Sequence, residues 1–403
     1  MTLSLHTLPL ELIYHILDHL DELTILCSCR LVCTRLDAII DTYHRYQVIF
    51  NFQTLTTLDL TSNKIGLEGT IYLAHALQHN KTLTILNLKH NKIYDEAIEY
   101  LADALQKNNT LTILNLDSNG IANRGAQYLA NALRINKTLN TLNLDFNQIG
   151  NEGIQHLANA LQQNKTLTTL GLENNQTGDQ GAQYLADALQ MNKTLTELNL
   201  RLNRIRVQGA QYLADALQQN ETLTKLNLEI NEIGDEGVHY LTNALKQNET
   251  LTTINFTFNR ITCQGAEHLA NALERNKALT TLILKHNEIG DQGVEHLAGA
   301  LLINKTLTTL YLENNQTGDQ GVLYLAIALQ INKTLTKLNL ENNQIGVQGA
   351  QYLGDALREN ETLTTLDLSF NRVGSQGAQH LARSLEQNKV TSFFSRKKQL
   401  ILR

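Results

Sequence analysis

The chain has 403 residues, with 33 basic and 39 acidic side chains and a formal net charge of −6. This balance lacks the surplus of basic residues that marks nucleic-acid-binding proteins, so we expect no nucleic-acid partner. No apolar run approaches the roughly 18 residues of a membrane-spanning helix, and the first residues lack the pattern of a secretory signal, so we expect a cytoplasmic protein without a membrane span.

The first region, residues 1–53, reads as a compact helical domain. Leu10, Ile13, Leu17 and Leu20 recur at helical spacing, and Pro9 precedes them where proline is tolerated, in the first helical turn. Two further apolar sets follow, over residues 23–31 and 32–40. A domain of this size cannot bury so many apolar side chains by itself, so a partner or the neighbouring region must cover them.

The second region, residues 54–389, consists of twelve consecutive units of 28 residues without an insertion, one of which reads "TLTTLGLENNQTGDQGAQYLADALQMNK". In the first unit, Leu58 and Leu60 alternate with polar residues, which predicts a strand with one buried face. Leu73 and Leu77 are four residues apart, which predicts a helix. Asn63 recurs at its position in every unit, and a polar side chain beside buried leucines needs its hydrogen bonds met. We therefore expect a stacked ladder of asparagine amides that bond to the backbone of neighbouring turns.

Two other recurring residue types occupy the ends of the predicted helices. Glycines at the positions of Gly66 and Gly69 are expected at the turn into the helix and where helix and strand approach closely. Asn80 and its equivalents end the helices, where we expect the left-handed cap conformation that asparagine tolerates. Several of them, including Asn136 and Asn220, begin an Asn-x-Thr glycosylation sequence. Because no signal peptide is recognisable, we interpret these asparagines as loop residues of the repeat.

Residues 390–403 break the repeat and form a C-terminal capping segment or a basic tail. In the first interpretation Phe393, Phe394, Leu400 and Ile401 cover the open edge of the last unit, and the basic residues among them face water. In the second, the segment is a sorting or nuclear signal.

The sequence contains no recognisable catalytic set, and we expect no cofactor and no metal. Cys27, Cys29 and Cys33 lie close together but lack the second ligand pair of a structural zinc site, so we interpret them as free thiols in a reducing compartment. His268 and His296 occupy the same position in successive units, but neither unit adds an obvious third ligand. We interpret both as half-buried rings with polar tips in water, like the tyrosines at the same position elsewhere.

The pattern L-x-x-L-x-L-x-x-N resembles the leucine-rich repeat family. The 28-residue unit with one helix is similar to the ribonuclease-inhibitor type, which also occurs in NOD-like receptors. The resemblance implies an α/β horseshoe solenoid with an inner parallel sheet and outer α-helices, preceded here by a small all-α domain.

The stretch "LPLELIYHILDHLDELTILCSCRLVCTRLDAII", residues 8–40, resembles the F-box. The resemblance implies docking on the Skp-type adaptor of a cullin–RING ubiquitin ligase. The residues that it places at this contact are Leu8, Pro9, Leu10, Glu11, Leu12, Ile13, Ile16, Leu17, Leu20, Leu23, Leu31, Val32 and Cys33. The chain departs from the family at Leu36, where many members have tryptophan.

An F-box before a long recognition surface predicts the substrate-recognition subunit of an SCF-type ubiquitin ligase. Such a subunit is not an enzyme; it binds adaptor, cullin and a protein substrate as a monomer within the complex. The strict repeat also fits a bacterial effector that acts in the host cytoplasm. Two alternatives are an interaction scaffold or sensor without a ubiquitin role, and a GTPase-activating protein, for which no exposed arginine beside a nucleotide site is evident.

The residue immediately before the ladder asparagine, which we call the edge slot, is the best candidate for substrate contact. Most exposed positions of the inner strands are polar, but in units 4, 6, 7, 8 and 12 the edge slot holds Phe146, Leu202, Ile230, Phe258 and Phe370. Units 6 to 8 are consecutive, so we expect Leu202, Ile230 and Phe258 to form a stripe with steps of about 4.8 Å. The predicted charged rim consists of Arg201, Arg204, Lys225, Glu229 and Arg260. The alternative is that these apolar side chains fold back under the loop or merely tolerate exposure.

Overall fold

The computed structural model describes residues 55–387 and 399–401. The F-box-like region lies outside the described residues, and with it all the residues predicted to bind the adaptor.

Within the described residues, thirteen strands form one parallel sheet in chain order. They are β1 (Thr57–Asp59), β2 (Ile85–Asn87), β3 (Ile113–Asn115), β4 (Thr141–Asn143), β5 (Thr169–Gly171), β6 (Glu197–Asn199), β7 (Lys225–Asn227), β8 (Thr253–Asn255), β9 (Thr281–Ile283), β10 (Thr309–Tyr311), β11 (Lys337–Asn339), β12 (Thr365–Asp367) and β13 (Gln399–Ile401). From β1 to β12, each residue lies opposite its equivalent in the next unit, as Leu58 lies opposite Leu86.

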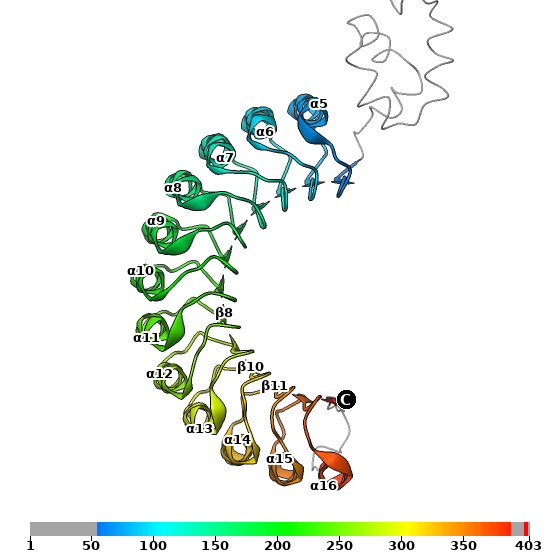
Figure 1. Cartoon of the computed structure of the whole chain (residues 1–403), viewed down its shortest axis with the longest axis vertical. Helices are drawn as coiled ribbons and strands as arrows, with labels where there is room; N and C mark the ends of the chain where they lie inside the picture. Colours follow the sequence, from blue (N-terminus) through cyan, green and yellow to red (C-terminus); the bar gives the residue numbers. More distant parts are fainter. Residues whose placement is uncertain (1–54, 388–398, 402–403) are drawn as a thin grey trace, which may run out of the picture.

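One helix follows each of the first twelve strands. These helices are α5 (Gly66–His79), α6 (Asp95–Lys107), α7 (Asn123–Ile135), α8 (Gly150–Leu161), α9 (Gly178–Met191), α10 (Val207–Leu217), α11 (Gly234–Leu245), α12 (Cys263–Leu273), α13 (Gly290–Leu301), α14 (Asp319–Ile331), α15 (Val347–Glu359) and α16 (Gly374–Gln387). The strands line the inside of an arc and the helices its outside (Figure 1). Stacked strands need about 4.8 Å each and packed helices about 8–10 Å, so the stack curves toward the sheet. The predicted solenoid is confirmed.

Between the two layers lies one continuous apolar core. Leu86 and Leu88 of unit 2 are buried, as are Leu101 and Leu105 of α6. Glycine permits the close approach of successive helices: a Cβ on Gly153 would lie 2.5 Å from Ile149 Cγ2 and 3.0 Å from the Cα of Asn123.

The predicted asparagine ladder is present. Asn91, for example, is fully buried, and its backbone N–H donates to Asn119 Oδ1 at 2.9 Å. Its own Oδ1 accepts from the backbone N–H of Asn63 at 2.9 Å, and its Nδ2 donates to the carbonyl oxygen of Leu60 at 2.8 Å. Each amide therefore bonds to the unit before it, and its backbone bonds to the unit after it.

The expected left-handed conformation of the helix-ending asparagines is wrong. Asn108, at the end of α6, has φ −73° and ψ 134°, which is extended backbone. Its Oδ1 accepts from the backbone N–H of Leu111 at 2.8 Å, and its Nδ2 donates to the carbonyl oxygen of Leu77 at 2.8 Å. These asparagines are selected because their amides bind the next turn and the preceding helix end, and they form a second ladder at the opposite end of the strands.

Left-handed backbone occurs instead at the edge slot. In all twelve units this residue has a positive φ, between 48° and 62°. The residues are Ser62, His90, Ser118, Phe146, Asn174, Leu202, Ile230, Phe258, His286, Asn314, Asn342 and Phe370. A left-handed conformation costs an L-residue about 1–2 kcal/mol, although asparagine tolerates it better than most and β-branched residues tolerate it worst.

Strand β13 extends the sheet beyond the last unit. It pairs with β12 in parallel, with Thr365 opposite Gln399 and Asp367 opposite Ile401. The C-terminal segment thus supplies backbone hydrogen bonds to a strand that would otherwise end the sheet.

We predict that a chain ending at residue 389 has a lower melting temperature or lower solubility than the full chain, because β12 loses its neighbour. Thermal denaturation and ultracentrifugation of the two forms measure this. Identical behaviour of both forms would favour the sorting-signal interpretation of residues 390–403.

Candidate functional site

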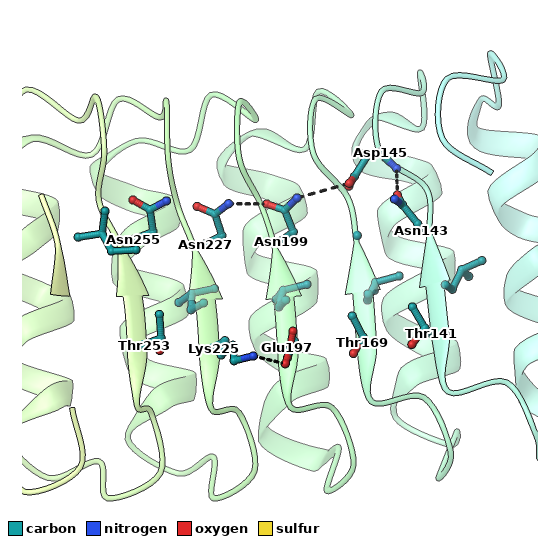
Figure 2. A pocket seen from close by; sticks show the side chains of 16 residues that line it. Thr141, Asn143, Asp145, Thr169, Glu197, Asn199, Lys225, Asn227, Thr253 and Asn255 are labelled. Carbon is teal, nitrogen blue, oxygen red and sulfur yellow. Dashed lines mark hydrogen bonds and ion pairs between the residues drawn. The ribbon is translucent and has the colours of Figure 1, made fainter. Parts of the chain in front are cut away.

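The inner face of the arc is a polar sheet surface whose side chains bond to one another along the stack. Figure 2 shows asparagines at the ends of successive strands, where Asn227 Nδ2 donates to Asn199 Oδ1 at 2.9 Å. Below them on the same strands, Lys225 pairs with Glu197 at 2.6 Å. A partner that lies across this face meets a regular row of amide donors and acceptors.

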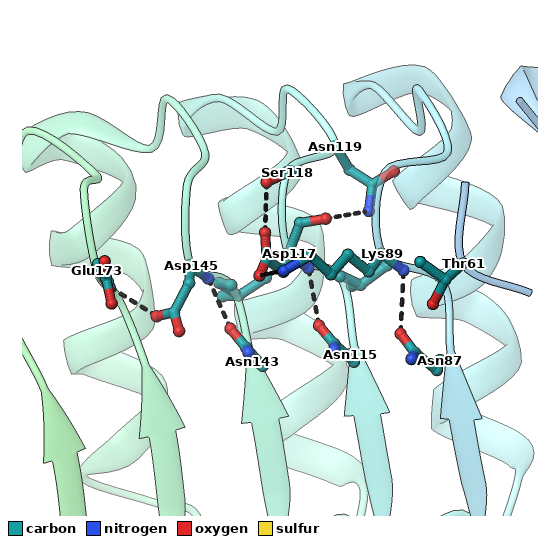
Figure 3. Close-up of polar contacts among 12 residues, drawn as sticks. Thr61, Asn87, Lys89, Asn115, Asp117, Ser118, Asn119, Asn143, Asp145 and Glu173 are labelled. Atoms are coloured by element: carbon teal, nitrogen blue, oxygen red, sulfur yellow. Dashed lines mark hydrogen bonds and ion pairs between the residues drawn. The ribbon is translucent and has the colours of Figure 1, made fainter. Parts of the chain in front are cut away.

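Two positions beyond each strand, most charged side chains have a partner of opposite sign. Lys89 pairs with Asp117 at 2.8 Å, as Figure 3 shows, and Lys285 pairs with Glu313 at 2.8 Å. Arg201 lies between two carboxylates: it pairs with Glu173 and, at 3.0 Å, with Glu229. The predicted rim residues Arg201 and Glu229 are therefore bonded to each other.

Asp145 and Glu341 are the exceptions in this row, because neither forms an ion pair among the described residues, and of the two only Asp145 lines a depression. Its Oδ1 accepts from the backbone N–H of Glu173 at 2.7 Å, and its Oδ2 has only a long contact, 3.5 Å, with Asn199 Nδ2. Burial, together with the negative charges of Glu173 and Asp117, raises the pKa of Asp145 to about 6, although the backbone hydrogen bond from Glu173 lowers it. Asp145 is a partly buried carboxylate that lacks a countercharge.

Gly171 makes the position of Asp145 possible. Most other units have asparagine at this strand position, but a Cβ on Gly171 would lie 2.7 Å from Asp145 Oδ1. Asp145 and Gly171 both line a depression of about 420 Å³ in the sheet surface, which extends from β4 to β9 and which we call the floor hollow. Its lining includes Asp145, Gly171, Glu197, Asn199 and Lys225.

A second depression, about 770 Å³, lies at the loop edge of the inner face. We call it the edge hollow. Its lining consists of Asn174, Leu202, Arg204, Ile230, Asn231, Glu232, Phe258, Arg260, His286 and Glu288. The structure thus brings together five of the predicted substrate-binding residues, namely Leu202, Arg204, Ile230, Phe258 and Arg260.

The other predicted contact residues lie apart from the edge hollow. Lys225 lines the floor hollow, and Glu229 lines a third depression of about 390 Å³ beside Phe258. Phe146 is 42% exposed in unit 4 and belongs to none of the three linings.

Sequence reasoning missed three aromatic or apolar residues at this face. His286 stacks on Phe258, with ring centroids 4.1 Å apart. The third depression is also lined by Ile283 and Tyr311, which replace the usual asparagine in units 9 and 10. Lys285 and Lys337 each lie 4.7 Å from the centre of the Tyr311 ring, so this ring is held between two cations. Comparison of that strand position across the units would have found Ile283 and Tyr311.

The apolar residues of the edge hollow occupy unfavourable backbone. Ile230 is β-branched and has φ 51°, and Phe258 has φ 55° and remains 48% exposed. Units 5, 10 and 11 have asparagine at the same slot, which fits the left-handed conformation better. Ile230 is half-buried and Phe258 is exposed, and apolar side chains held in unfavourable backbone at the surface point to contact with another molecule.

On the outer face, His268 and His296 are half-buried, as predicted. His268 of α12 contacts His239 of α11, with 3.4 Å between their Nδ1 atoms. Burial and the neighbouring His239 lower the pKa of His268. Over the described residues, no group of three or more His, Cys, Asp or Glu side chains has a geometry suited to a metal ion. In the same part of the chain, none of the helices has the length and apolar character of a membrane-spanning segment.

A parallel sheet with one outer helix per unit and a continuous amide ladder defines a leucine-rich-repeat solenoid. Residues 46–401 match the family described as the NLRC3 LRR domain, and the chain belongs to this family. Residues 5–50 match the family described as F-box-like. The predicted combination of an F-box-like domain with repeats of the NOD-like-receptor type is thereby confirmed.

No curated protein matches the chain. Among solved structures, the chain is similar to one described as Leiomodin-1 Actin-Binding Site 2 (ABS2), with 22% identity and a TM-score of 0.31. The match covers 43% of this chain and 86% of that chain.

The pKa of Asp145 leads to a prediction about stability. Its carboxyl binds a proton more tightly in the folded than in the unfolded chain, so the free energy of unfolding falls as the pH rises from about 4 to about 6. Asp145→Asn keeps an acceptor for Glu173 and removes the buried charge. At pH 7.5 we expect it to raise the free energy of unfolding by on the order of 1 kcal/mol, a figure reduced for the partial exposure of the group.

At pH 4 the difference between Asp145→Asn and the natural chain should become small, because Asp145 is then neutral in the folded chain. Urea titrations at the two pH values measure this. Glu341→Gln, at the equivalent position of unit 11, is the control for removal of a carboxylate elsewhere on the same face. A variant that is less stable at pH 7.5 would contradict the burial argument.

Proposed function

We propose that this protein is the substrate-recognition subunit of an SCF-type ubiquitin ligase in the cytoplasm. The F-box-like domain docks on a Skp-type adaptor and cullin, and the repeats bind a protein substrate. The observation that carries the proposal is the combination, in one chain, of an F-box-like match over residues 5–50 and a repeat domain with an open, hollowed inner face. The protein does no chemistry itself; it raises the concentration of substrate near the conjugating enzyme of the ligase.

We assign substrate contact to the inner face around the edge hollow. Apolar side chains at its centre and charged residues at its rim form the arrangement typical of protein interfaces. Leu202, Ile230 and Phe258 supply the centre, and Arg204 and Arg260 belong to the rim. Phe146, Arg201, Lys225 and Glu229 are neighbouring parts of the same face.

The adaptor contact is tested by replacing Leu8 and Pro9 together with alanine. We expect the double variant to lose adaptor and cullin in a pulldown, because docking energy is concentrated in a few apolar anchors. Its repeat domain should keep its melting temperature. Adaptor binding that survives the double substitution would favour an interaction scaffold without a ubiquitin role.

The substrate contact is tested by Ile230→Asn together with Phe258→Asn. Asparagine fits left-handed backbone, so the melting temperature should be unchanged or higher, while proteins retained by the full chain in a pulldown should be lost. Phe370→Asn is the matched control, since Phe370 occupies the same slot with φ 56° in unit 12 but lines none of the three depressions. A lower melting temperature of the double variant would show that these side chains serve packing, and unchanged partners would place the substrate elsewhere.

A further inference from the structure

We propose that the inner face binds an extended substrate segment with a lysine or arginine about four residues from a large apolar side chain. The basic side chain pairs with Asp145 in the floor hollow, and the apolar side chain enters the edge hollow between Leu202, Ile230 and Phe258. The inference rests on the proposed function, because the segment belongs to the substrate that the repeats recognise.

The charges of the inner face favour a basic side chain at the floor hollow. Neighbouring carboxylates already have cations: Asp117 has Lys89, Glu173 has Arg201, and Glu197 has Lys225. Among the described residues, Asp145 Oδ2 has only the long contact with Asn199 Nδ2. A cation from a partner would supply the missing countercharge inside a depression that excludes part of the solvent.

Gly171 lets the Asp145 carboxylate lie over strand β5 in the lining of the floor hollow. The flanking units have Asn143 and Asn199 at this strand position (Figure 2), whereas a Cβ on the buried Gly171 would lie 2.7 Å from Asp145 Oδ1. We expect a long side chain to lie across the floor hollow, with its methylene groups over the neighbouring strands and its charge at Asp145.

The edge hollow favours an apolar side chain. Its centre combines Ile230 with Phe258, whose ring is already stacked on His286 and so is fixed in orientation. A preorganised aromatic wall costs little to order on binding, which is a property of residues that dominate binding energy.

The distance between the hollows sets the spacing of the two side chains. Asp145 is in unit 4 and Ile230 in unit 7, so three strand steps of about 4.8 Å separate them by about 14 Å. An extended chain rises about 3.3 Å per residue and covers this distance in about four residues. An even spacing also directs both side chains to the same face of the segment, toward the sheet.

The surface between the hollows suits the backbone of such a segment. Arg201, which lies between the hollows, already pairs with Glu173 and Glu229, so the segment needs no acidic side chain at this point. The amides of Asn199 and Asn227 offer hydrogen-bonding groups at the height of the strand ends. A helical segment would need about nine residues to cover the same distance, since a helix rises about 1.5 Å per residue.

Selection of phage-displayed random 12-residue peptides on the full chain tests the proposal. We expect enrichment of peptides with lysine or arginine four residues from leucine, isoleucine, methionine or phenylalanine. For a selected peptide, fluorescence anisotropy should show Asp145→Asn weakening the affinity about tenfold or more. Ile230→Asn with Phe258→Asn should abolish binding, and the matched controls Glu341→Gln and Phe370→Asn should leave it unchanged.

Several outcomes would overturn the proposal. These are selected peptides without a basic residue, an affinity insensitive to Asp145→Asn, a spacing of about nine residues, or no enrichment at all. Adaptor binding by the same variants is measured in parallel. If the protein binds the adaptor but selects peptides without the expected motif, the proposed function stands and this inference is wrong. If it selects the expected motif but does not bind the adaptor, the ligase role is wrong.

Discussion

The hydrogen bond from each ladder asparagine to the next unit is the interaction on which the rest of the structure depends. The Asn91 amide is buried and bonded on both sides, so an insertion that moved it by one residue would leave donors and acceptors unmet in two units. The ladder therefore fixes the unit length and keeps every strand in register with its neighbours. Core positions vary mostly among apolar residues, such as Ile254 and Phe256 in place of leucine, whereas the positions that face away from the core vary in charge and polarity.

The same architecture explains why strain collects at the edge of the inner face. Each ladder asparagine follows a residue with positive φ, so the slot exists in every unit regardless of its occupant. Asn174 and Asn314 fit it, whereas Ile230 and Phe258 do not. The many repeated hydrogen bonds keep the fold stable even when a few residues have an unfavourable backbone conformation. Such residues can therefore serve binding at a small cost in stability.

The repeats, strands, helices and asparagine ladder could be predicted because each recurs at one position in every unit and has a single physical explanation. The edge stripe of Leu202, Ile230 and Phe258 could be predicted for a different reason, because three consecutive units have an apolar residue at a slot that is polar in most other units. The left-handed backbone could not, since the edge slot holds serine, histidine and phenylalanine without the glycine that normally signals it. Asp145 was missed because its environment combines side chains from adjacent units with the absence of one at Gly171. An environment that depends on side chains from several units cannot be predicted from the sequence alone.

The second ladder, formed by the helix-ending asparagines, restricts whether the chain can be glycosylated and still fold. Asn136 and most of its equivalents begin the Asn-x-Thr sequence that is the acceptor for N-glycosylation. Both hydrogens of the Asn136 Nδ2 are used, on the carbonyl oxygens of Leu105 and Asn108 at 2.7 and 3.2 Å. The residue is only 5% exposed, so a sugar attached there would force successive units apart. Glycan attachment and repeat stacking are therefore mutually exclusive at these positions. If the unfolded chain entered a glycosylating compartment, sugars would be attached to the amide nitrogens that join its units. The repeats can therefore stack only if the chain folds before glycosylation or is not exposed to the glycosylating enzyme.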